Sequence, residues 1–431
     1  MKLKFSVAVI AITALFGWRV CAQNYDTNGD YVQTFAGSGF SGDVNGVGML
    51  TMFNGPNTIV ADSHSNLFFW DSGNYKIKEI KADGTVTTFA GGGNQTTGVG
   101  TNVNFNSYYD LGGLTVDHND TFWAYSTGSS YSFWLYKISS DATVTYTNLG
   151  SIEEEVGIAG DNSIQGLCVD STGNIYLTIF SSAYNSSFNK VYRFTTNGTL
   201  TVFVGSGNKG YVDGNGIFTD FNNPTTLACD EADNIYVWDS GNDLIRRIDQ
   251  SQNVTTFAGK YQNGSNVDGV GTNAAFNSIY QMCFDNSGNL YLACGSCIRK
   301  IDATTNVVTL AGSFTQTGYI NGAGNLARFN GADGVCIAGG TIYVADSSNQ
   351  RIRSITNNPT AQVVSPANLQ LNTYLGLQII GTVGRTYQIQ TSPDLNSWST
   401  RATILLNSSP YIWIDQNPVS GNKFYRALLL P

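Results

Sequence analysis

The sequence is poor in charge, histidine and proline. Only 12% of its 431 residues are charged, about half the fraction usual in a soluble domain. It has two histidines and eight prolines, whereas glycine reaches 48 residues and aromatics 12%. Disordered chains carry few aromatics, and helical bundles are rich in Ala, Glu, Lys and Leu, so both classes are excluded. An all-β chain with many glycine and asparagine turns remains.

The scarcity of histidine also restricts the chemistry. His64 and His118 both fall in predicted turns. A Ser–His–Asp or Cys–His arrangement needs a histidine held by a third group, and histidine-rich zinc catalysis needs several. We therefore predict solvated turn histidines, no catalytic residues and no metal site.

Residues 1–22 have the pattern of a secretory signal. A positively charged start and an apolar stretch precede the small residues Val20-Cys21-Ala22, which predicts cleavage after Ala22 and an exported protein, in the medium, the periplasm or at the cell surface. We expect no transmembrane segment, because no later apolar run reaches the roughly 20 residues that span a bilayer. The net charge of −9 disfavours nucleic acid as a partner. We expect a monomer that binds a protein or a carbohydrate.

A repeat dominates the chain. Segments similar to Thr34-Phe35-Ala36-Gly37 recur 53 to 60 residues apart, with the aromatic or leucine position at Phe35, Phe89, Leu149, Phe203, Phe257 and Leu310. Each unit continues with a Gly/Asn-rich connection, a Phe-Asn pair and four short runs that alternate apolar and polar residues between turns. Four-stranded sheets repeated radially are propeller blades.

The ends of the repeat indicate how the ring closes. The sixth unit stops at Ile355 with its third strand, and Tyr31–Gly37 has no three strands before it. We infer that this N-terminal segment supplies the outer strand of the last blade, which removes the open edge. The alternative is a loose leading strand and an incomplete last blade.

The pattern resembles NHL repeats. Residues 205–248 and 312–355 match most closely an NHL pattern that includes Asp-x-x-Gly-Asn-Ile-Tyr-Val and Ile-Arg-x-Ile, and residues 91–138 and 150–194 are degenerate. The resemblance implies an all-β fold with a six-bladed β-propeller over residues 23–358. The segment 359–431 has a different pattern and is predicted to be a small β-sandwich-like module, which serves attachment, secretion, ligand binding or capping.

The six cysteines that remain after cleavage fall into two groups. Cys168, Cys229, Cys283 and Cys336 recur near one repeat position and are predicted to be buried, apolar side chains. Cys294 and Cys297 instead flank Gly-Ser, a two-residue turn, in place of the second hairpin turn of unit five. Cross-strand cysteines at such a turn can form a disulfide in an oxidising compartment. A disulfide and a pair of free thiols both remain open, and a thioredoxin-like redox site is the least favoured alternative.

No cofactor is predicted, and calcium is the one metal weighed. Asp26-Thr27-Asn28-Gly29-Asp30 offers oxygens at alternate positions, as a calcium loop does, but it lacks the following glycine and the glutamate at position twelve. The simpler interpretation is a turn before the closing strand.

The best binding candidates lie where two units depart from the repeat. The second hairpin turn is long in units two and three, and it carries Tyr131, Phe133 and Trp134 in one and Tyr184 and Phe188 in the other. Exposed aromatics beside Asn and Ser suit stacking on sugars or docking of a peptide. Alternatively, these loops fold back over the outer edge of the blades.

Three functional hypotheses follow. The first is an exported, non-enzymatic binding or scaffold protein that presents propeller loops to a protein or carbohydrate. The alternative is a lactonase-like propeller hydrolase or lyase with a divalent metal in the central channel, although the sequence shows no matching carboxylate pattern. The third is a cell-surface spacer without a small ligand.

Overall fold

The computed structural model describes most of the repeat region and five segments of the C-terminal region. These are residues 29–105, 111–126, 134–149, 162–181, 189–357, 375–379, 384–392, 397–406, 411–415 and 424–429. The chain divides into two compact units, Met1–Gln362 and Val363–Pro431. The predicted signal segment and all but the last two residues of the calcium candidate lie outside the described residues.

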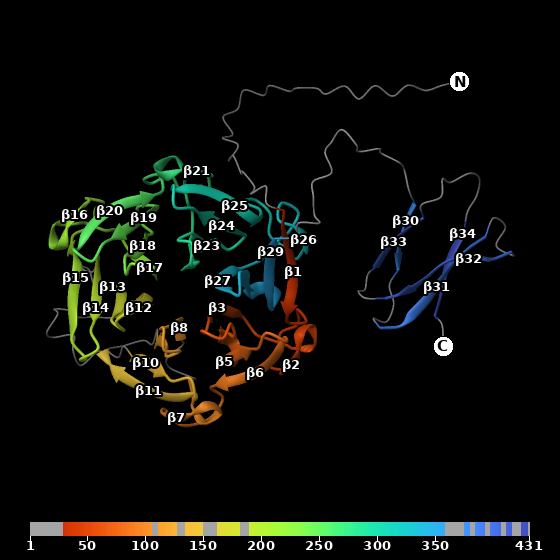
Figure 1. Cartoon of the computed structure of the whole chain (residues 1–431), viewed down its shortest axis with the longest axis horizontal. Coiled ribbons are helices and arrows are strands. Elements are labelled where there is room, and N and C mark those ends of the chain that lie inside the picture. Colours follow the sequence, from red (N-terminus) through yellow and green to blue (C-terminus); the bar gives the residue numbers. More distant parts are fainter. Residues whose placement is uncertain are drawn as a thin grey trace, which may run out of the picture. The chain divides into compact units, whose positions relative to one another are not determined.

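Six antiparallel sheets surround a central axis in the first unit, as the sequence predicts (Figure 1). From the axis outward, blade 1 has β3 (Pro56–Ala61), β4 (Leu67–Asp71), β5 (Lys76–Ile80), β6 (Thr85–Ala90) and the short β2 (Gly46–Val47). Blade 2 has β8 (Leu111–Val116), β9 (Phe122–Ser126), β10 (Trp134–Ile138), β11 (Thr143–Asn148) and β7 (Gly98–Val99). Blade 3 has β12 (Asn162–Val169), β13 (Ile175–Ser181), β14 (Asn189–Phe194) and β15 (Leu200–Gly207).

The second half of the ring repeats this order. Blade 4 has β17 (Pro224–Cys229), β18 (Ile235–Asp239), β19 (Leu244–Ile248), β20 (Asn253–Ala258) and β16 (Gly214–Asn215). Blade 5 has β22 (Gln281–Phe284), β23 (Leu290–Ala293), β24 (Cys297–Ile301), β25 (Asn306–Gly312) and β21 (Gly269–Val270). Blade 6 has β27 (Ala332–Ala338), β28 (Thr341–Asp346), β29 (Arg351–Asn357), β1 (Asp30–Ala36) and β26 (Gly322–Ala323).

The N-terminal strand closes the ring, which confirms the prediction. β1 pairs antiparallel with β29 from Asp30 to Ala36 and also with β26, so that it becomes the fourth strand of blade 6. Val32 is fully buried in this position. Because the first and last parts of the repeat share one sheet, the termini leave no unpaired strand edge between them.

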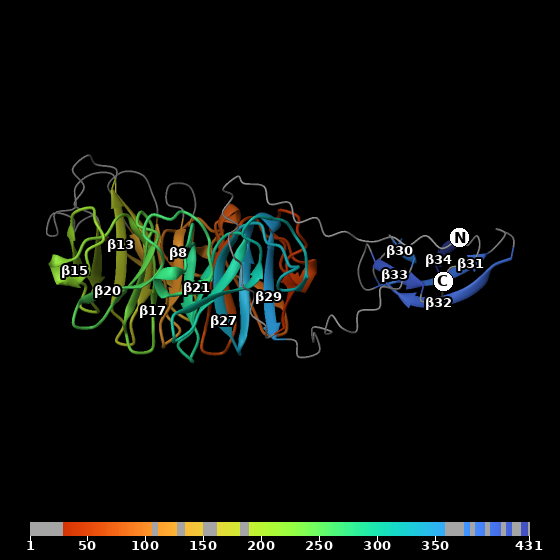
Figure 2. The ribbon, with the colours of Figure 1, turned by 90° about the horizontal axis from the view of Figure 1, so that it is seen from above.

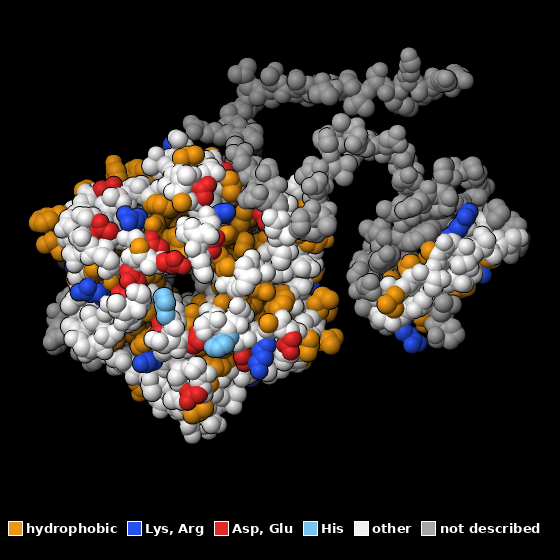
Figure 3. Space-filling view, in the orientation of Figure 1, with side chains coloured by type: hydrophobic (Ala, Val, Ile, Leu, Met, Phe, Trp, Pro, Cys, Tyr) orange, Lys and Arg blue, Asp and Glu red, His pale blue; other side chains and the backbone are white. Residues whose placement is uncertain are grey.

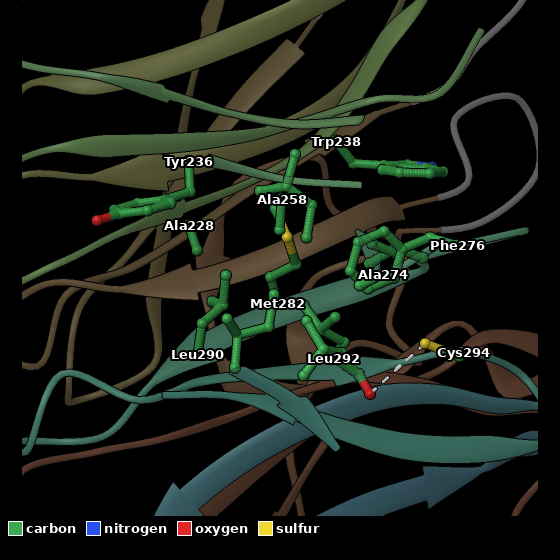
Figure 4. Packing of buried hydrophobic residues seen from close by; sticks show 14 of the residues in the cluster. Ala228, Tyr236, Trp238, Ala258, Ala274, Phe276, Met282, Leu290, Leu292 and Cys294 are labelled. Atoms are coloured by element: carbon green, nitrogen blue, oxygen red, sulfur yellow. Dashed lines mark hydrogen bonds between the residues drawn. The ribbon is translucent and has the colours of Figure 1, made fainter. Parts of the chain in front are cut away.

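Each blade is packed on both faces, so every residue of β4 and of β18 is buried. Apolar side chains of one blade meet those of the next; Tyr236 and Trp238 of blade 4 contact the cluster formed by Met282, Leu290 and Leu292 of blade 5 (Figure 4). Glycine allows the chain to leave each blade: Gly37 has a φ of +96°, and a Cβ there would lie 2.4 Å from the Gln350 carbonyl oxygen. The recurring Phe-Ala-Gly is thus a steric requirement.

The strand order gives the propeller two functional faces, seen edge-on in Figure 2. The turn between the first and second strands of every blade lies on one face, which we call the first-turn face. In blades 1, 4, 5 and 6, where it is described, the turn between the second and third strands lies on the other face, the second-turn face. The 3-10 turns η2 (Ser72–Asn74) and η7 (Ser347–Asn349) are of this second kind. Four further 3-10 turns follow the outermost strands: η1 (Gly48–Leu50), η3 (Gly100–Asn102), η5 (Gly216–Phe218) and η6 (Gly271–Asn273).

The C-terminal unit contains two separate sheets. One pairs β30 (Leu375–Ile379) with β33 (Tyr411–Asp415), and the other has the order β32 (Ser399–Leu405), β31 (Thr386–Ser392), β34 (Phe424–Leu429). Ile389 and Leu406 are buried between their neighbours, and the Arg426 guanidinium lies 4.2 Å from the centre of the Trp398 ring. Across the described parts of both units, no helix has the length and apolar character needed to cross a membrane.

Candidate functional site

The aspartates of the repeated Asp-Gly turns form ion pairs with buried arginines on the third strands. Arg246 of blade 4 bonds Asp213 at 2.6 Å and Asp239 at 3.0 Å, and its side chain is fully buried. Arg299 of blade 5 bonds Asp268 at 2.9 Å. Blades 2 and 3, which the repeat pattern matches poorly, carry buried tyrosines at this strand position. These aspartates therefore bind arginines within their own blades and have a structural role.

The repeat breaks on the second-turn face of blade 5. In blade 1, four residues separate the paired Asp71 and Lys76. In blade 5 the register places Cys294 opposite Cys297, with only Gly295 and Ser296 between them. Cys294 thus occupies the place of the aspartate that ends the second strand in blades 1, 4 and 6, and the hairpin is two residues shorter than in blade 1.

A cavity of about 480 Å³ lies over this short hairpin, between blades 5 and 6. Its walls come from four separate stretches of the chain, each on the second-turn face. The lining residues are Asn266, Asn277, Ser278, Tyr280, Cys294, Gly295, Ser296, Phe314, Thr317, Asn330, Gly331, Asp333 and Ser348. We call this cavity the blade-5 pocket.

The pocket combines an exposed ring with amides, hydroxyls and one carboxylate. The Tyr280 side chain is 56% exposed. The Asn330 backbone N–H donates a hydrogen bond to Asp346 at 2.8 Å. The Asn330 side-chain amide has no hydrogen-bond partner among the described residues. Asp333 accepts a hydrogen bond from Ser347, and burial raises the pKa of its carboxyl group. The pocket therefore offers both donors and acceptors beside an apolar surface.

Contacts between the blades fix the shape of the pocket. Gly295 and Ala332 exchange two backbone hydrogen bonds, of 3.0 and 2.6 Å, which tie the short hairpin to blade 6. Gly295 has a φ of +75°, and a Cβ there would lie 3.2 Å from the Tyr280 ring. Below the pocket, the Arg299 guanidinium lies 5.2 Å from the centre of the Phe314 ring. Contacts within the protein therefore hold the walls of the pocket in place.

The two cysteines of the hairpin are free thiols in the structure. Both belong to the apolar cluster between blades 4 and 5, and Figure 4 shows the Cys294 sulfur directed toward the Leu292 carbonyl oxygen, 3.9 Å away. The other cysteines are also free; Cys168 and Cys336 are buried, and Cys229 and Cys283 are half-buried. Burial raises the pKa of all four of these thiols, which keeps them protonated.

The central channel has a volume of about 310 Å³ and is lined mainly by the first strands of the blades. Gln281 connects the first strands of blades 1 and 6 in the channel. Its side-chain oxygen accepts hydrogen bonds from the Ile59 N–H at 3.1 Å and the Val335 N–H at 3.2 Å, and its side-chain amide donates to the Ile59 carbonyl oxygen at 2.8 Å. The described lining residues include neither Asp nor Glu. They therefore do not fit the carboxylate set that a divalent metal in this channel needs.

The histidines lie on the first-turn face, where Figure 3 shows both of them near the central opening. His64 is 76% exposed, and its Nδ1 is 3.2 Å from Ser63 Oγ and 3.5 Å from Asp120. Ser63 donates its hydroxyl proton to Asp120 at 2.7 Å, not to the histidine. This geometry ties blade 1 to blade 2, and it lacks the serine–histidine–aspartate order of a nucleophilic triad.

Most of the predicted aromatic site cannot be placed. Tyr131, Phe133, Tyr184 and Phe188 lie outside the described residues. Trp134 begins β10, and its half-buried ring packs on Tyr146, with 4.1 Å between the ring centres. The blade-5 pocket was not predicted from the sequence. Its signal was Cys294-Gly295-Ser296-Cys297, which drew attention only as a cysteine pair.

Comparisons with known proteins agree with the fold. A family model described as NHL repeat matches residues 329–353. NHL repeat-containing protein 2 from Bos taurus is 24% identical over 350 residues, which is 69% of this chain and 46% of that protein. This chain thus spans about half the length of that curated relative.

Two solved structures from Bacteroides thetaiotaomicron show the same architecture. A structural genomics protein of unknown function is 21% identical, with a TM-score of 0.58 and 76% of each chain covered. An auxiliary nutrient binding protein is 17% identical, with a TM-score of 0.56 and the same coverage. At these identities the likeness concerns the fold.

Proposed function

Since this chain is a β-propeller built from NHL repeats, we propose that it is an exported, non-catalytic binding protein that takes a carbohydrate in the blade-5 pocket. The observation that carries the proposal is the exposed Tyr280 ring, which lines a cavity together with several Asn, Ser and Thr side chains. Sugars present apolar ring faces and many hydroxyl groups, and this combination of side chains serves both.

The charge and rigidity of the pocket support the same class of ligand. Lys and Arg are absent from the described lining, so an anionic ligand finds no complementary cation, and Asp333 is its single carboxylate. The hydrogen bonds between Gly295 and Ala332 hold two walls in place before binding. A preformed site reduces the entropy lost on association.

The proposal of export rests on two observations. Residues 1–22 have the composition of a secretory signal. A solved structure with the same propeller architecture is described as an auxiliary nutrient binding protein, and a protein that collects a carbohydrate works where its ligand is found. We also propose that the long turns of blades 2 and 3, with Tyr131, Phe133, Trp134, Tyr184 and Phe188, contribute to the binding surface.

The alternative of a lactonase-like hydrolase or lyase gains no specific support. Its divalent metal would need carboxylates that converge on the channel, and the described channel lining has none. The described residues also contain no group of three or more His, Cys, Asp or Glu side chains placed to hold a metal ion.

The test is a glycan array with the mature chain from Gln23, followed by calorimetry on the glycans that bind. We expect Tyr280→Ala to weaken binding at least about tenfold, because it removes the stacking surface. Asn330→Ala should also weaken it. Tyr211→Ala is the control, because Tyr211 is similarly exposed, at 51%, but packs on Tyr261 away from the pocket.

Three results would contradict the proposal. Full affinity in Tyr280→Ala together with loss in Trp134→Ala would assign the ligand to the long turns of blades 2 and 3. An empty array combined with turnover of a lactone or polysaccharide would favour the enzyme. An empty array without any turnover would favour a structural spacer.

A further inference from the structure

The short hairpin of blade 5 places two thiols directly opposite each other. The register of β23 and β24 pairs Ala293 with Ile298, and one step further it pairs Cys294 with Cys297. The Cys294 N–H donates to the Cys297 carbonyl oxygen at 3.0 Å. Directly opposed residues in such a pair have Cα atoms about 5.5 Å apart, which lies inside the range that a disulfide spans.

Both side chains lie on the same face of the sheet. Cys294 and Cys297 belong to one apolar cluster between blades 4 and 5. The backbone therefore already has the arrangement of a cross-strand pair, and bond formation requires rotation of the thiols without any change of register.

The two thiols differ in access. Cys294 lines the blade-5 pocket and is 7% exposed, whereas Cys297 is completely buried. Cys294 is therefore the member of the pair that adjoins the pocket. Gly295, with its positive φ, makes the two-residue turn possible and leaves no side chain over Cys294.

Their surroundings differentiate them further. The neighbouring Cys297 side chain lowers the pKa of Cys294, and the nearby Arg299 guanidinium acts in the same direction. The neighbouring Cys294 side chain and burial raise the pKa of Cys297. Since the thiolate is the reactive form of cysteine, Cys294 is the nucleophile of the pair.

We propose that Cys294 and Cys297 form a thiol–disulfide exchange site for small disulfides that enter the blade-5 pocket. The Cys294 thiolate attacks one sulfur of the disulfide and forms a mixed disulfide, and the first thiol leaves and takes up the proton that Cys294 released. Cys297 then attacks the Cys294 sulfur and expels the second thiol. The dithiol loses two hydrogens and becomes a disulfide, and the small disulfide is reduced to two thiols.

This inference does not depend on the carbohydrate proposal, because it needs only access to the pocket. The other four cysteines provide an internal comparison. Each lies on the first strand of a blade, and burial raises its pKa. None of them faces a second cysteine across a hairpin turn within the described strands.

The experiment treats the reduced, folded mature chain with oxidised glutathione and follows it by intact mass and peptide mapping. We expect the wild type to form a Cys294–Cys297 disulfide without retained glutathione. Cys297→Ser should retain one glutathione on Cys294, because the second attack is missing. Cys294→Ser should react at least about tenfold more slowly than Cys297→Ser, because the remaining thiol is buried. Cys283→Ser is the matched control and should behave as the wild type.

Two outcomes would overturn the inference. One is a wild type that remains a dithiol while other cysteines react. The other is equal trapping of glutathione by Cys294→Ser and Cys297→Ser. Alkylation kinetics of each cysteine in the unmutated chain provide a test that needs no folded variant: Cys294 must react first. Glycan binding measured on the same samples reports the first proposal independently.

Discussion

The buried Asp239–Arg246 ion pair of blade 4 allows a quantitative test of what stabilises a blade. Asp239 ends β18 and is fully buried. Its carboxylate accepts hydrogen bonds from the Asn222 N–H at 2.6 Å, from the Asn242 side chain at 2.6 Å and from Arg246 at 3.0 Å. All three donors would lose their acceptor in Asp239→Ala, and water has no access to replace it.

We expect this substitution to lower the free energy of unfolding by about 3–5 kcal/mol, the usual cost of removing one partner from a buried pair. Arg246 keeps its bond to Asp213, whose side chain is 47% exposed, so the loss falls short of a fully isolated charge. The double variant Asp239→Ala/Arg246→Met removes both charges. It should be more stable than the sum of the two single losses predicts, by about 1–3 kcal/mol.

Urea unfolding followed by tryptophan fluorescence measures these differences, with Trp238 as a buried reporter in the same strand. Asp249→Ala is the control: this exposed turn aspartate also accepts hydrogen bonds from Ser251 and Asn253, but in contact with water. The reasoning is refuted if Asp239→Ala costs no more than Asp249→Ala. Additive single losses would equally show that the pair is not coupled.

Three further predictions concern closure, turns and pH. Val32→Asp should destabilise the propeller by several kcal/mol, on the order expected for an unpaired buried carboxylate. Limited proteolysis should then cleave this variant, but not the control Gln33→Asp, which lies on the exposed side of β1. Gly37→Ala should cost more stability than Gly198→Ala in thermal unfolding, because both have a positive φ but only Gly37 meets the backbone within 4 Å; equal losses would contradict the steric argument. Burial raises the pKa of Asp239 to about 6, so the folded state binds this proton more tightly than the unfolded state does. Its stabilisation is therefore complete below about pH 4 and is lost as the pH rises through 6, and the stability of the wild type relative to Asp239→Asn should fall by on the order of 3 kcal/mol over that window; a difference independent of pH would contradict the assignment.

The fold was largely predictable because its signals are local and repeated. The alternation of apolar residues, the Phe-Ala-Gly exits and the Gly-rich turns each act over a few residues, and six copies reinforce one another. Even the closure by β1 could be inferred, because the sixth unit lacks a fourth strand and Tyr31–Gly37 has no unit of its own.

The candidate site was only partly predictable. The sequence alone determined six blades, the turn positions of His64 and His118, and the departure from the repeat at Cys294 to Cys297. It did not indicate that this departure opens a pocket, because the walls come from residues 266–280, 294–296, 314–317 and 330–348. Only the packing of blade 5 against blade 6 brings these stretches together. The shorter hairpin alone changes only the turn between β23 and β24. It leaves a cavity because the neighbouring blade does not fill the space.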